Sequence, residues 1–280
     1  MTHQHVLISG ATSGIGLATA LQLDQAGWQV YALAHPDDDF APLREQASER
    51  LIPLACDITD ADAITHAIAP IETLDALVNN AGIQVVGTLE TLSISALQHQ
   101  FNVNIIGHLQ MIQALLPALK RAERARIVNV SSLMGKVALP VLGAYSMSKH
   151  ALEAMSDVLR LELAPWGIDV IVVAPGAVQT PMTASMAQLL QDAQAHLNAD
   201  QRADYAPLYA GMAQTLDRQN ASAVPAEQVA ATIVKAITRD RPQPRYVIGA
   251  PTKGLMLMRS LAPDQVGDAI LKRALGIKDS

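Results

Sequence analysis

Cysteine is almost absent from the 280-residue chain, and aromatic residues are scarce. Cys56 is the only cysteine, which excludes an internal disulfide and any metal site built from several cysteines. Aromatic residues make up 3% of a chain that is 50% hydrophobic, so its core has to be built from Ala, Val, Leu, Ile and Met. Such a core suits helices that are layered on a buried sheet.

The sequence also lacks a dense basic patch, a long apolar run and a leader-like N-terminus. Its net charge of −6 is spread along the chain, so we expect no nucleic-acid partner. No apolar run reaches the ~18 residues of a membrane span, and "MTHQHVLISG" contains no basic region followed by an apolar stretch. We therefore expect a cytoplasmic protein without a transmembrane segment.

Short β-branched runs alternate with helical stretches over most of the chain. The runs are HVLIS, QVYALA, LIPLA, DALVNN, ARIVNVSS, GIDVIVVAP and PRYVIG. This alternation predicts an α/β fold, a doubly wound parallel sheet with helices on both faces. The length fits one Rossmann-type domain that spans residues 1–280.

Two segments depart from the alternation. The strand pattern lapses at about residues 180–224, and an insertion of this length after a strand is more often a functional flap than a structureless loop. From about residue 251 to 280 the chain indicates a C-terminal extension of one or two helices. Its stretch GLMLMRSLA could touch a membrane surface, although such patterns more often pack on their own domain.

The ends of the predicted strands carry glycine and polar residues. Gly10, Gly14 and Gly16 lie between the first strand and a helix, where glycines let backbone N–H groups approach a pyrophosphate. After the third strand, Asp57 could accept a hydrogen bond from an adenine amino group or cap the next helix. After the fourth, NNAG could approach a ligand or form a plain turn.

Taken together, these motifs resemble those of a known family. GATSGIG, NNAG, NVN, VSS, YSMSK and PGAVQT occur in the order and rough spacing of the short-chain dehydrogenase/reductase family, from about Val6 to Thr180. The resemblance implies a Rossmann-type, NAD(P)-dependent oxidoreductase that acts on an alcohol or carbonyl. Ser9 stands where the family more often has threonine, and both carry a hydroxyl. The extension with PRYVIG most resembles the hydroxysteroid and retinol dehydrogenase-like branch.

The resemblance implies that Asn104, Ser132, Tyr145 and Lys149 form the active site, with no metal. A tyrosine hydroxyl with a pKa near ~10 is a poor base at neutral pH. An ammonium ~4 Å away contributes roughly 4 kcal/mol at an effective dielectric constant of about 20, or on the order of three pKa units. Lys149 would thereby bring the pKa of Tyr145 close to neutral pH, where a general acid/base is most effective. Ser132 would bind the substrate oxygen, and Asn104 would place a water beside Lys149. Alone, Ser132 could be a turn residue and Asn104 a mid-helix polar residue.

The same resemblance implies a cofactor site along the strand ends. Within it, the turn at Pro175 and Gly176, together with Thr180, would contact the nicotinamide carboxamide, although Pro and Gly also suit a plain strand terminator. The implied cofactor-binding residues are Gly10, Thr12, Ser13, Gly14, Ile15, Gly16, His35, Asp57, Ile58, Asn80, Ala81, Gly82, Tyr145, Lys149, Pro175, Gly176, Val178 and Thr180.

The end of the second strand bears on the choice between the two cofactors. Ala34 stands where NAD-specific relatives have an acid, and His35 where many NADP-preferring relatives have arginine. Ser13 is not the basic residue that some NADP-binding relatives carry. The acidic run at 37–39 could repel a phosphate, unless it points to solvent at the start of the next helix. We favour NADP(H) over NAD(H) at about two to one.

Apolar residues near the expected site predict an adaptable pocket for a hydrophobic ketone or alcohol, although they could equally pack the flap. They are Met134, Val137, Leu139, Leu142, Met182, Met186, Leu189, Leu190, Leu208, Tyr209 and Met212. The alternative function is a catalytically silent, dinucleotide-sensing protein on the same fold. The resemblance also implies a homodimer or homotetramer that associates through the long helices near 93–120 and 144–164.

Overall fold

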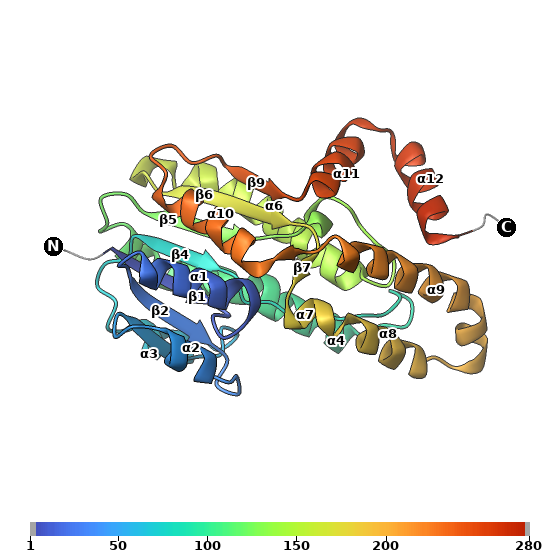
Figure 1. Cartoon of the computed structure of the whole chain (residues 1–280), viewed down its shortest axis with the longest axis horizontal. Helices are drawn as coiled ribbons and strands as arrows, with labels where there is room; N and C mark the ends of the chain where they lie inside the picture. The colour runs from blue at the N-terminus through green and yellow to red at the C-terminus, as the bar shows by residue number, and fades with distance from the viewer. Residues whose placement is uncertain (1–3, 278–280) are drawn as a thin grey trace.

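The computed structural model describes residues 4–277, and it confirms the doubly wound sheet (Figure 1). All seven strands of this sheet are parallel, in the order β3-β2-β1-β4-β5-β6-β9. The strands are β1 (His5–Ser9), β2 (Gln29–Ala34), β3 (Leu51–Ala55), β4 (Ala76–Asn79), β5 (Arg126–Val130), β6 (Asp169–Pro175) and β9 (Arg245–Ile248). Each predicted run contains one of them.

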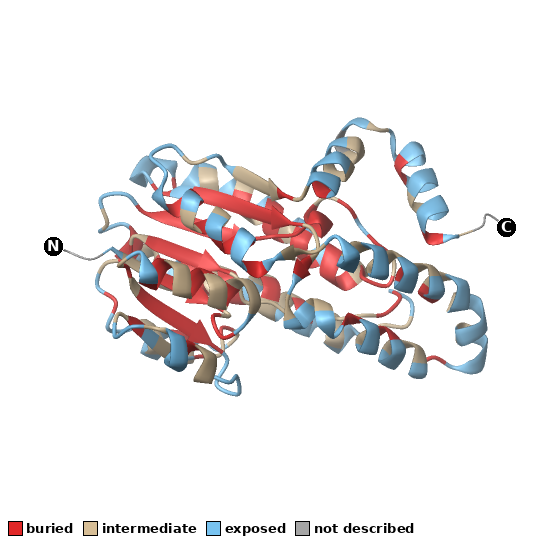
Figure 2. Cartoon of the chain, viewed as in Figure 1, coloured by how far each residue is buried: buried red, intermediate tan, exposed pale blue. Residues whose placement is uncertain are grey.

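Helices cover both faces of the sheet. One hydrophobic cluster joins the sheet to α1 (Gly14–Gln25), α2 (Ala41–Gln46) and α10 (Ala226–Thr238). A second cluster joins the opposite face to α3 (Ala61–Ile68), α5 (His108–Leu119) and α6 (Gly143–Glu162). Because both faces are covered, the central strands are buried throughout (Figure 2), which is why they read as continuous apolar runs.

The strand order reverses between β1 and β4, which are neighbours although β2 and β3 separate them in sequence. In such sheets, ligands bind outside the carboxyl ends of the strands at this reversal. The segment predicted as one helix near 93–120 is α4 (Ile94–Phe101), a π-helical turn η1 (Asn102–Gly107) and α5 in direct succession. Two short 3₁₀ turns, η2 (Leu133–Gly135) and η3 (Ala164–Trp166), flank α6.

The segment predicted as a flap is helical and closed at its base. Its two ends pair as the short strands β7 (Val178–Gln179) and β8 (Val224–Pro225). Between them lie α7 (Pro181–Ala184), α8 (Met186–Ala195) and α9 (Ala199–Ala221), and α8 and α9 project beyond the sheet in Figure 1.

The C-terminal extension forms α11 (Ala250–Leu261) and α12 (Asp264–Leu275). A third hydrophobic cluster joins the flap to the segment around Tyr145 and to Leu275 of α12. None of the helices within residues 4–277 combines the length and apolar character that crossing a bilayer requires.

Candidate active site

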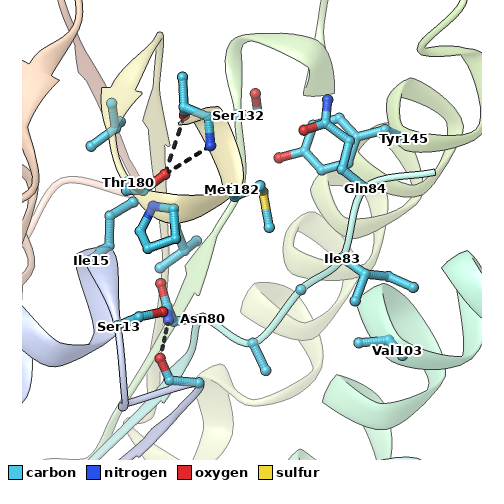
Figure 3. Close-up of a pocket in the computed structure, with 18 of the residues that line it drawn as sticks. Ser13, Ile15, Asn80, Ile83, Gln84, Val103, Ser132, Tyr145, Thr180 and Met182 are labelled. Atoms are coloured by element: carbon cyan, nitrogen blue, oxygen red, sulfur yellow. Dashed lines mark hydrogen bonds between the residues drawn. The ribbon is translucent and has the colours of Figure 1, made fainter. Parts of the chain in front are cut away.

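A cavity of about 570 Å³ opens at the carboxyl ends of the strands, where the strand order reverses. Figure 3 shows Ser13, Ile15 and Asn80 toward one end of it and Tyr145 toward the other. Of the residues that the sequence implied for catalysis and cofactor binding, all line this cavity except Gly16 and Asn104. Those two lie behind its wall, with the contacts described below.

The glycine turn brings unpaired backbone donors to the cavity. Gly10 has a left-handed φ of +65°, and a Cβ there would lie 2.8 Å from Ala81 Cα, so only glycine fits between the ends of β1 and β4. Asn80 Nδ2 donates to the Gly10 carbonyl at 3.1 Å, and Gly16 packs against both groups. The N-cap of α1, Ser13, makes no capping hydrogen bond from its side chain. The first N–H groups of α1 can therefore bind an anion, which fits a dinucleotide pyrophosphate.

The three aspartates after β2 point in different directions. Asp38 Oδ2 accepts hydrogen bonds from Thr12 Oγ1 at 3.0 Å and from the His35 N–H at 3.2 Å, and this carboxylate lines the cavity. Asp39 instead accepts from the Ala41 N–H at the start of α2, and the Asp37 side chain is exposed. Of these three aspartates, only Asp38 lines the cavity.

Asp57 lies beside His35 at the same end of the cavity. Its Oδ1 accepts from the N–H and the Oγ1 of Thr59, at 2.8 and 2.9 Å, and its Oδ2 is 3.8 Å from His35 Nε2. The helix-cap alternative for Asp57 is wrong, because the side chain that caps α3 belongs to Asp60. Asp57 thus remains available to a ligand in the cavity.

Asn104 belongs to a row of three side chains that binds the chain after β4. The row comprises Gln100, Asn104 and His108, all buried, and we call it the polar row. The side-chain amides of Gln100 and Asn104 donate to the Ile83 carbonyl, at 2.7 and 3.1 Å. Their amide oxygens accept from the N–H groups of Val85 (2.8 Å) and Ile83 (2.9 Å), respectively. His108 Nε2 is hydrogen-bonded to the Ala81 carbonyl at 2.8 Å.

The π-helical turn explains how residues four apart stay in line. In a regular helix of 3.6 residues per turn, each step of four overshoots one turn, so the row would drift around the helix. The wider π turn at Asn102–Gly107 compensates for this drift. The Asn104 amide also donates to Ser148 Oγ at 3.2 Å, so this side chain braces the wall behind the cavity and does not line it.

Tyr145 and Lys149 lie one turn apart on α6, and both are buried. Lys149 Nζ donates to the Val130 carbonyl at 2.8 Å and lies 5.6 Å from the centre of the Tyr145 ring. Ser132 is the N-cap of η2, and a hydrogen bond from its side chain lowers the pKa of Tyr145. The turn after β5 and the face of α6 thus bring three of the four implied catalytic residues to one end of the cavity.

The acidities of this pair differ from the sequence-based expectation. Burial raises the pKa of Tyr145 to about 12, and the Ser132 hydrogen bond opposes this only in part. Burial lowers the pKa of Lys149 to about 8, against the opposing charge of Glu153. The expected lowering of the Tyr145 pKa toward neutrality assumed partial burial and a bound cofactor whose oxidised nicotinamide ring adds positive charge. Tyr145 is 9% and Lys149 4% exposed, and the loss of hydration has the largest effect on the pKa of each group.

The apolar residues proposed for the pocket divide into two sets. Met134, Met182 and Met186 line the cavity, and Figure 3 shows Met182 at its centre. The others pack within or against the flap cluster: Val137, Leu139, Leu142, Leu189, Leu190, Leu208, Tyr209 and Met212.

Several cavity residues were not found from the sequence. They include Gln84, His99, Leu216, Gln219 and Asn220. Gln84 comes two residues after NNAG, and that proximity was the one available signal. His99 and the three residues of α9 reach the cavity only because tertiary packing turns α4 and α9 toward it.

Comparisons with known proteins agree with this geometry. The family model for short chain dehydrogenase matches residues 4–190. The chain is 34% identical over 278 residues to retinol dehydrogenase 5 of Mus musculus, covering 95% of this chain and 87% of that protein. It is 30% identical over 284 residues to the NADPH-dependent 3-dehydrocapnine reductase of Ornithobacterium rhinotracheale, covering 97% of each.

A solved structure extends the likeness to the whole fold. The crystal structure of a short-chain dehydrogenase from Streptomyces avermitilis is 27% identical, with a TM-score of 0.78, and the match covers 97% of this chain and 96% of that one. The glycine turn, the Tyr145 and Lys149 pair and these matches lead to one conclusion. The chain belongs to the short-chain dehydrogenase family of oxidoreductases.

Proposed function

We propose that the protein transfers a hydride between NADP(H) and the carbon of a carbonyl or secondary alcohol, with Tyr145 as the general acid/base. The observation that carries the proposal is the single cavity that has the glycine turn at one end and Ser132, Tyr145 and Lys149 at the other. One cavity can thereby hold a dinucleotide and a small substrate end to end.

Each residue of the cavity has a role in carbonyl reduction. The cofactor, when bound, supplies the hydride. Ser132 donates a hydrogen bond to the substrate oxygen and holds the reacting carbon in place. Tyr145 gives its hydroxyl proton to that oxygen as the carbon–oxygen double bond becomes single. The Lys149 ammonium stabilises the phenolate that remains.

The pKa of Tyr145, raised to about 12, favours reduction at neutral pH. The hydroxyl then holds the proton that reduction consumes, whereas alcohol oxidation has to begin from the phenolate. We therefore propose that carbonyl reduction is faster than alcohol oxidation at pH 7 and that the oxidation rate rises at alkaline pH. Initial rates in both directions measure this.

The substrate that we propose is a hydrophobic ketone or alcohol. Met134, Met182, Met186 and Leu216 line the cavity, and flexible thioether side chains adapt to apolar ligands of different shape. Retinol dehydrogenase 5, one of the relatives, is named for a hydrophobic alcohol. Turnover confined to small polar sugars in a substrate panel would overturn this assignment.

Residues near the end of β2 act in opposite directions on the preference for NADP(H). His35 and the lack of an acid at Ala34 favour the phosphorylated cofactor, and one relative is named as NADPH-dependent. The Asp38 carboxylate, held against Thr12, opposes a 2′-phosphate by charge repulsion. Dissociation constants for NADPH and NADH decide between them, and tighter binding of NADH would overturn the preference.

Association into a homodimer or homotetramer remains part of the proposal. Large apolar side chains are exposed along α4, η1 and α6, including Ile94, Ile106, Val158 and Leu161. Burying such a surface against a second copy removes it from water. Sedimentation equilibrium measures the subunit number, and a monomer at micromolar concentration would contradict this part.

The experiment that tests the function removes the hydroxyl group of Tyr145. Tyr145→Phe removes the proton donor and leaves the ring in place, so we expect kcat for ketone reduction to fall by about 10²- to 10⁴-fold. The dissociation constant for NADPH, followed by cofactor fluorescence, should stay within about twofold of wild type. If the wild-type protein binds the dinucleotide but turns over no member of a broad carbonyl panel, the silent sensor becomes the better description.

A further inference from the structure

A buried carboxylate lies one helical turn beyond Lys149, outside the proposed catalytic set. Glu153 follows Lys149 by four residues on α6, so the two side chains share a helix face. The Glu153 side chain is 2% exposed. A buried charge costs several kcal/mol unless it is compensated, so its position next to the site needs a physical reason.

Glu153 Oε2 joins three elements of the fold. It accepts hydrogen bonds from Arg245 of β9, with Nε at 2.9 Å and Nη2 at 2.6 Å. The ammonium of Lys136 is 3.5 Å from the same oxygen. Lys136 is the residue directly after η2, the turn that Ser132 caps. The carboxylate thus connects α6 to the edge strand and to the segment that carries the catalytic serine.

The second oxygen of Glu153 is buried and has no hydrogen-bond partner among the described residues. The hydroxyl of Ser131, which lines the cavity, is buried and unpartnered as well. Both lie against Gly135: a Cβ there would be 2.7 Å from Ser131 Oγ and 3.2 Å from Glu153 Oε1. Part of the carboxylate therefore faces the interior of the protein instead of its paired cations.

The cations that bind Glu153 lie nearer to solvent than the carboxylate does. The Lys136 side chain is 40% exposed and that of Arg245 27%, and Arg245 also pairs with Asp157 at 3.3 Å. Water screens exposed charges much more than buried ones. The paired cations of Glu153 therefore offset its electrostatic potential less in the buried interior, which also holds Lys149, than they do near the surface.

Lys149 has few other charged neighbours. Tyr145 is protonated, because burial raises its pKa to about 12. His108, whose pKa is lowered to about 3 by burial and by Lys149, is uncharged. Among the described residues, Glu153 is the charge that raises the pKa of Lys149, against the burial that lowers it.

We propose that Glu153 is a positioning residue: its carboxylate keeps Lys149 as an ammonium ion and, through Lys136, holds the turn that carries Ser132. The proposal deepens the proposed function and rests on it, because it assigns the charge that supports Lys149 in carbonyl reduction. Glu153 itself is not among the residues that line the cavity.

The effect of removing this charge has a definite sign. Without Glu153, the pKa of Lys149 falls further below its ordinary value, so the ammonium loses its proton at a lower pH. The phenolate that forms during reduction then has no adjacent cation. The alkaline limb of the reductive rate, where activity is lost as Lys149 deprotonates, accordingly moves toward lower pH.

The test is the pH profile of kcat for ketone reduction in Glu153→Gln, which keeps the shape of the side chain. We expect the alkaline limb to move down by on the order of one pH unit, while the dissociation constant of NADPH stays within about twofold. Asp157→Asn is the control, because it removes a carboxylate from the same arginine at a side chain 43% exposed, and its limb should not move.

Two further variants distinguish electrostatics from damage to the fold. Glu153→Asp keeps the charge and should restore most of the profile. Lys136→Gln removes the ion pair that joins Glu153 to the turn of Ser132, so it should raise KM for the ketone without moving the limb; this carries the test if Glu153→Gln does not fold, and an unchanged KM would then overturn the inference. An unmoved limb in Glu153→Gln, or an equal shift in Asp157→Asn, would overturn the inference.

The Tyr145→Phe variant distinguishes a failure of the proposed function from a failure of the role assigned to Glu153. If Tyr145→Phe remains fully active, the proposed function fails whatever Glu153 does. If Tyr145→Phe is inactive and the limb does not respond to Glu153, only the role of Glu153 fails.

Discussion

The two walls of the cavity are built in different ways. One wall consists of the carboxyl ends of β1, β4, β5 and β6, with the glycine turn, and we call it the strand wall. The other consists of α7, α8 and α9, and we call it the flap wall. The strands are buried throughout, whereas the flap helices and the C-terminal pair α11 and α12 are largely exposed (Figure 2).

The difference lies in what fixes the position of each wall. Backbone ladders on both sides hold the strand wall, so its groups keep their places with little freedom. One cluster of Leu, Met and Tyr side chains holds the flap wall, and such contacts can repack around ligands of different shape. We therefore assign the proposed hydride and proton transfer to the strand wall, and recognition of the substrate to the flap wall.

The largest effect on cofactor binding that we expect comes from the strand wall. Gly10→Ala adds a Cβ 2.8 Å from Ala81 Cα at a left-handed φ, which costs about 1–2 kcal/mol for the conformation alone. With the clash included, we expect the dissociation constant of NADPH to rise by more than about tenfold. Gly27→Ala is the matched control, because Gly27 shares a positive φ but a Cβ there meets nothing within 4 Å. If both variants weaken NADPH binding equally, the close approach is not what matters.

The next effect concerns acid stability and the polar row, which binds the chain after β4 behind the strand wall. The pKa of His108 is lowered to about 3 by burial, so the folded protein holds it neutral while the unfolded chain binds a proton below about pH 6.5. The stability present above pH 6.5 is therefore lost as the pH falls toward 3, by about 1.4 kcal/mol per pH unit.

This loss can be measured by urea unfolding between pH 7 and pH 4. His108→Gln should flatten the slope, whereas replacement of the exposed His66 should leave it unchanged. A slope that is equally steep in His108→Gln would mean that other groups cause the acid sensitivity.

The smallest effect is expected in the flap wall. Met186→Ala shortens a side chain that lines the cavity, so KM for an apolar ketone should rise by about three- to tenfold, with NADPH binding unchanged. Met212→Ala is the control: Met212 is fully buried in the same cluster but does not line the cavity. It should lower the melting temperature without changing KM. Similar KM values in the two variants would remove the distinction between the walls.

Much of the strand wall could be predicted from the sequence. Buried parallel strands leave continuous apolar runs, and the residues after them reach one edge of the sheet whatever the details of packing. For that reason, Gly10, Asp57 and Asn80 were singled out from local sequence, and the family resemblance added Ser132 and the roles of all four.

The flap wall and the electrostatics could not be predicted in the same way. Which face α9 turns toward the cavity depends on packing among distant segments, so Leu216, Gln219 and Asn220 were missed. The sequence placed Lys149 near Tyr145, but it did not reveal how deeply both are buried. Burial raises the pKa of Tyr145, whereas the sequence-based expectation, which assumed partial burial and a bound cofactor, was a lowered pKa.

The polar row of Gln100, Asn104 and His108 determines how the chain continues beyond the carboxyl end of β4. The chain after β4 leaves the ladder, yet the N–H groups of Ile83 and Val85 and the carbonyl of Ile83 remain bonded, to side chains instead of a neighbouring strand. Amide and imidazole groups of one helix thus act as a substitute strand. The path of this segment past the active site is therefore set by three side chains, each of which a single mutation can remove, and not by the backbone of the sheet.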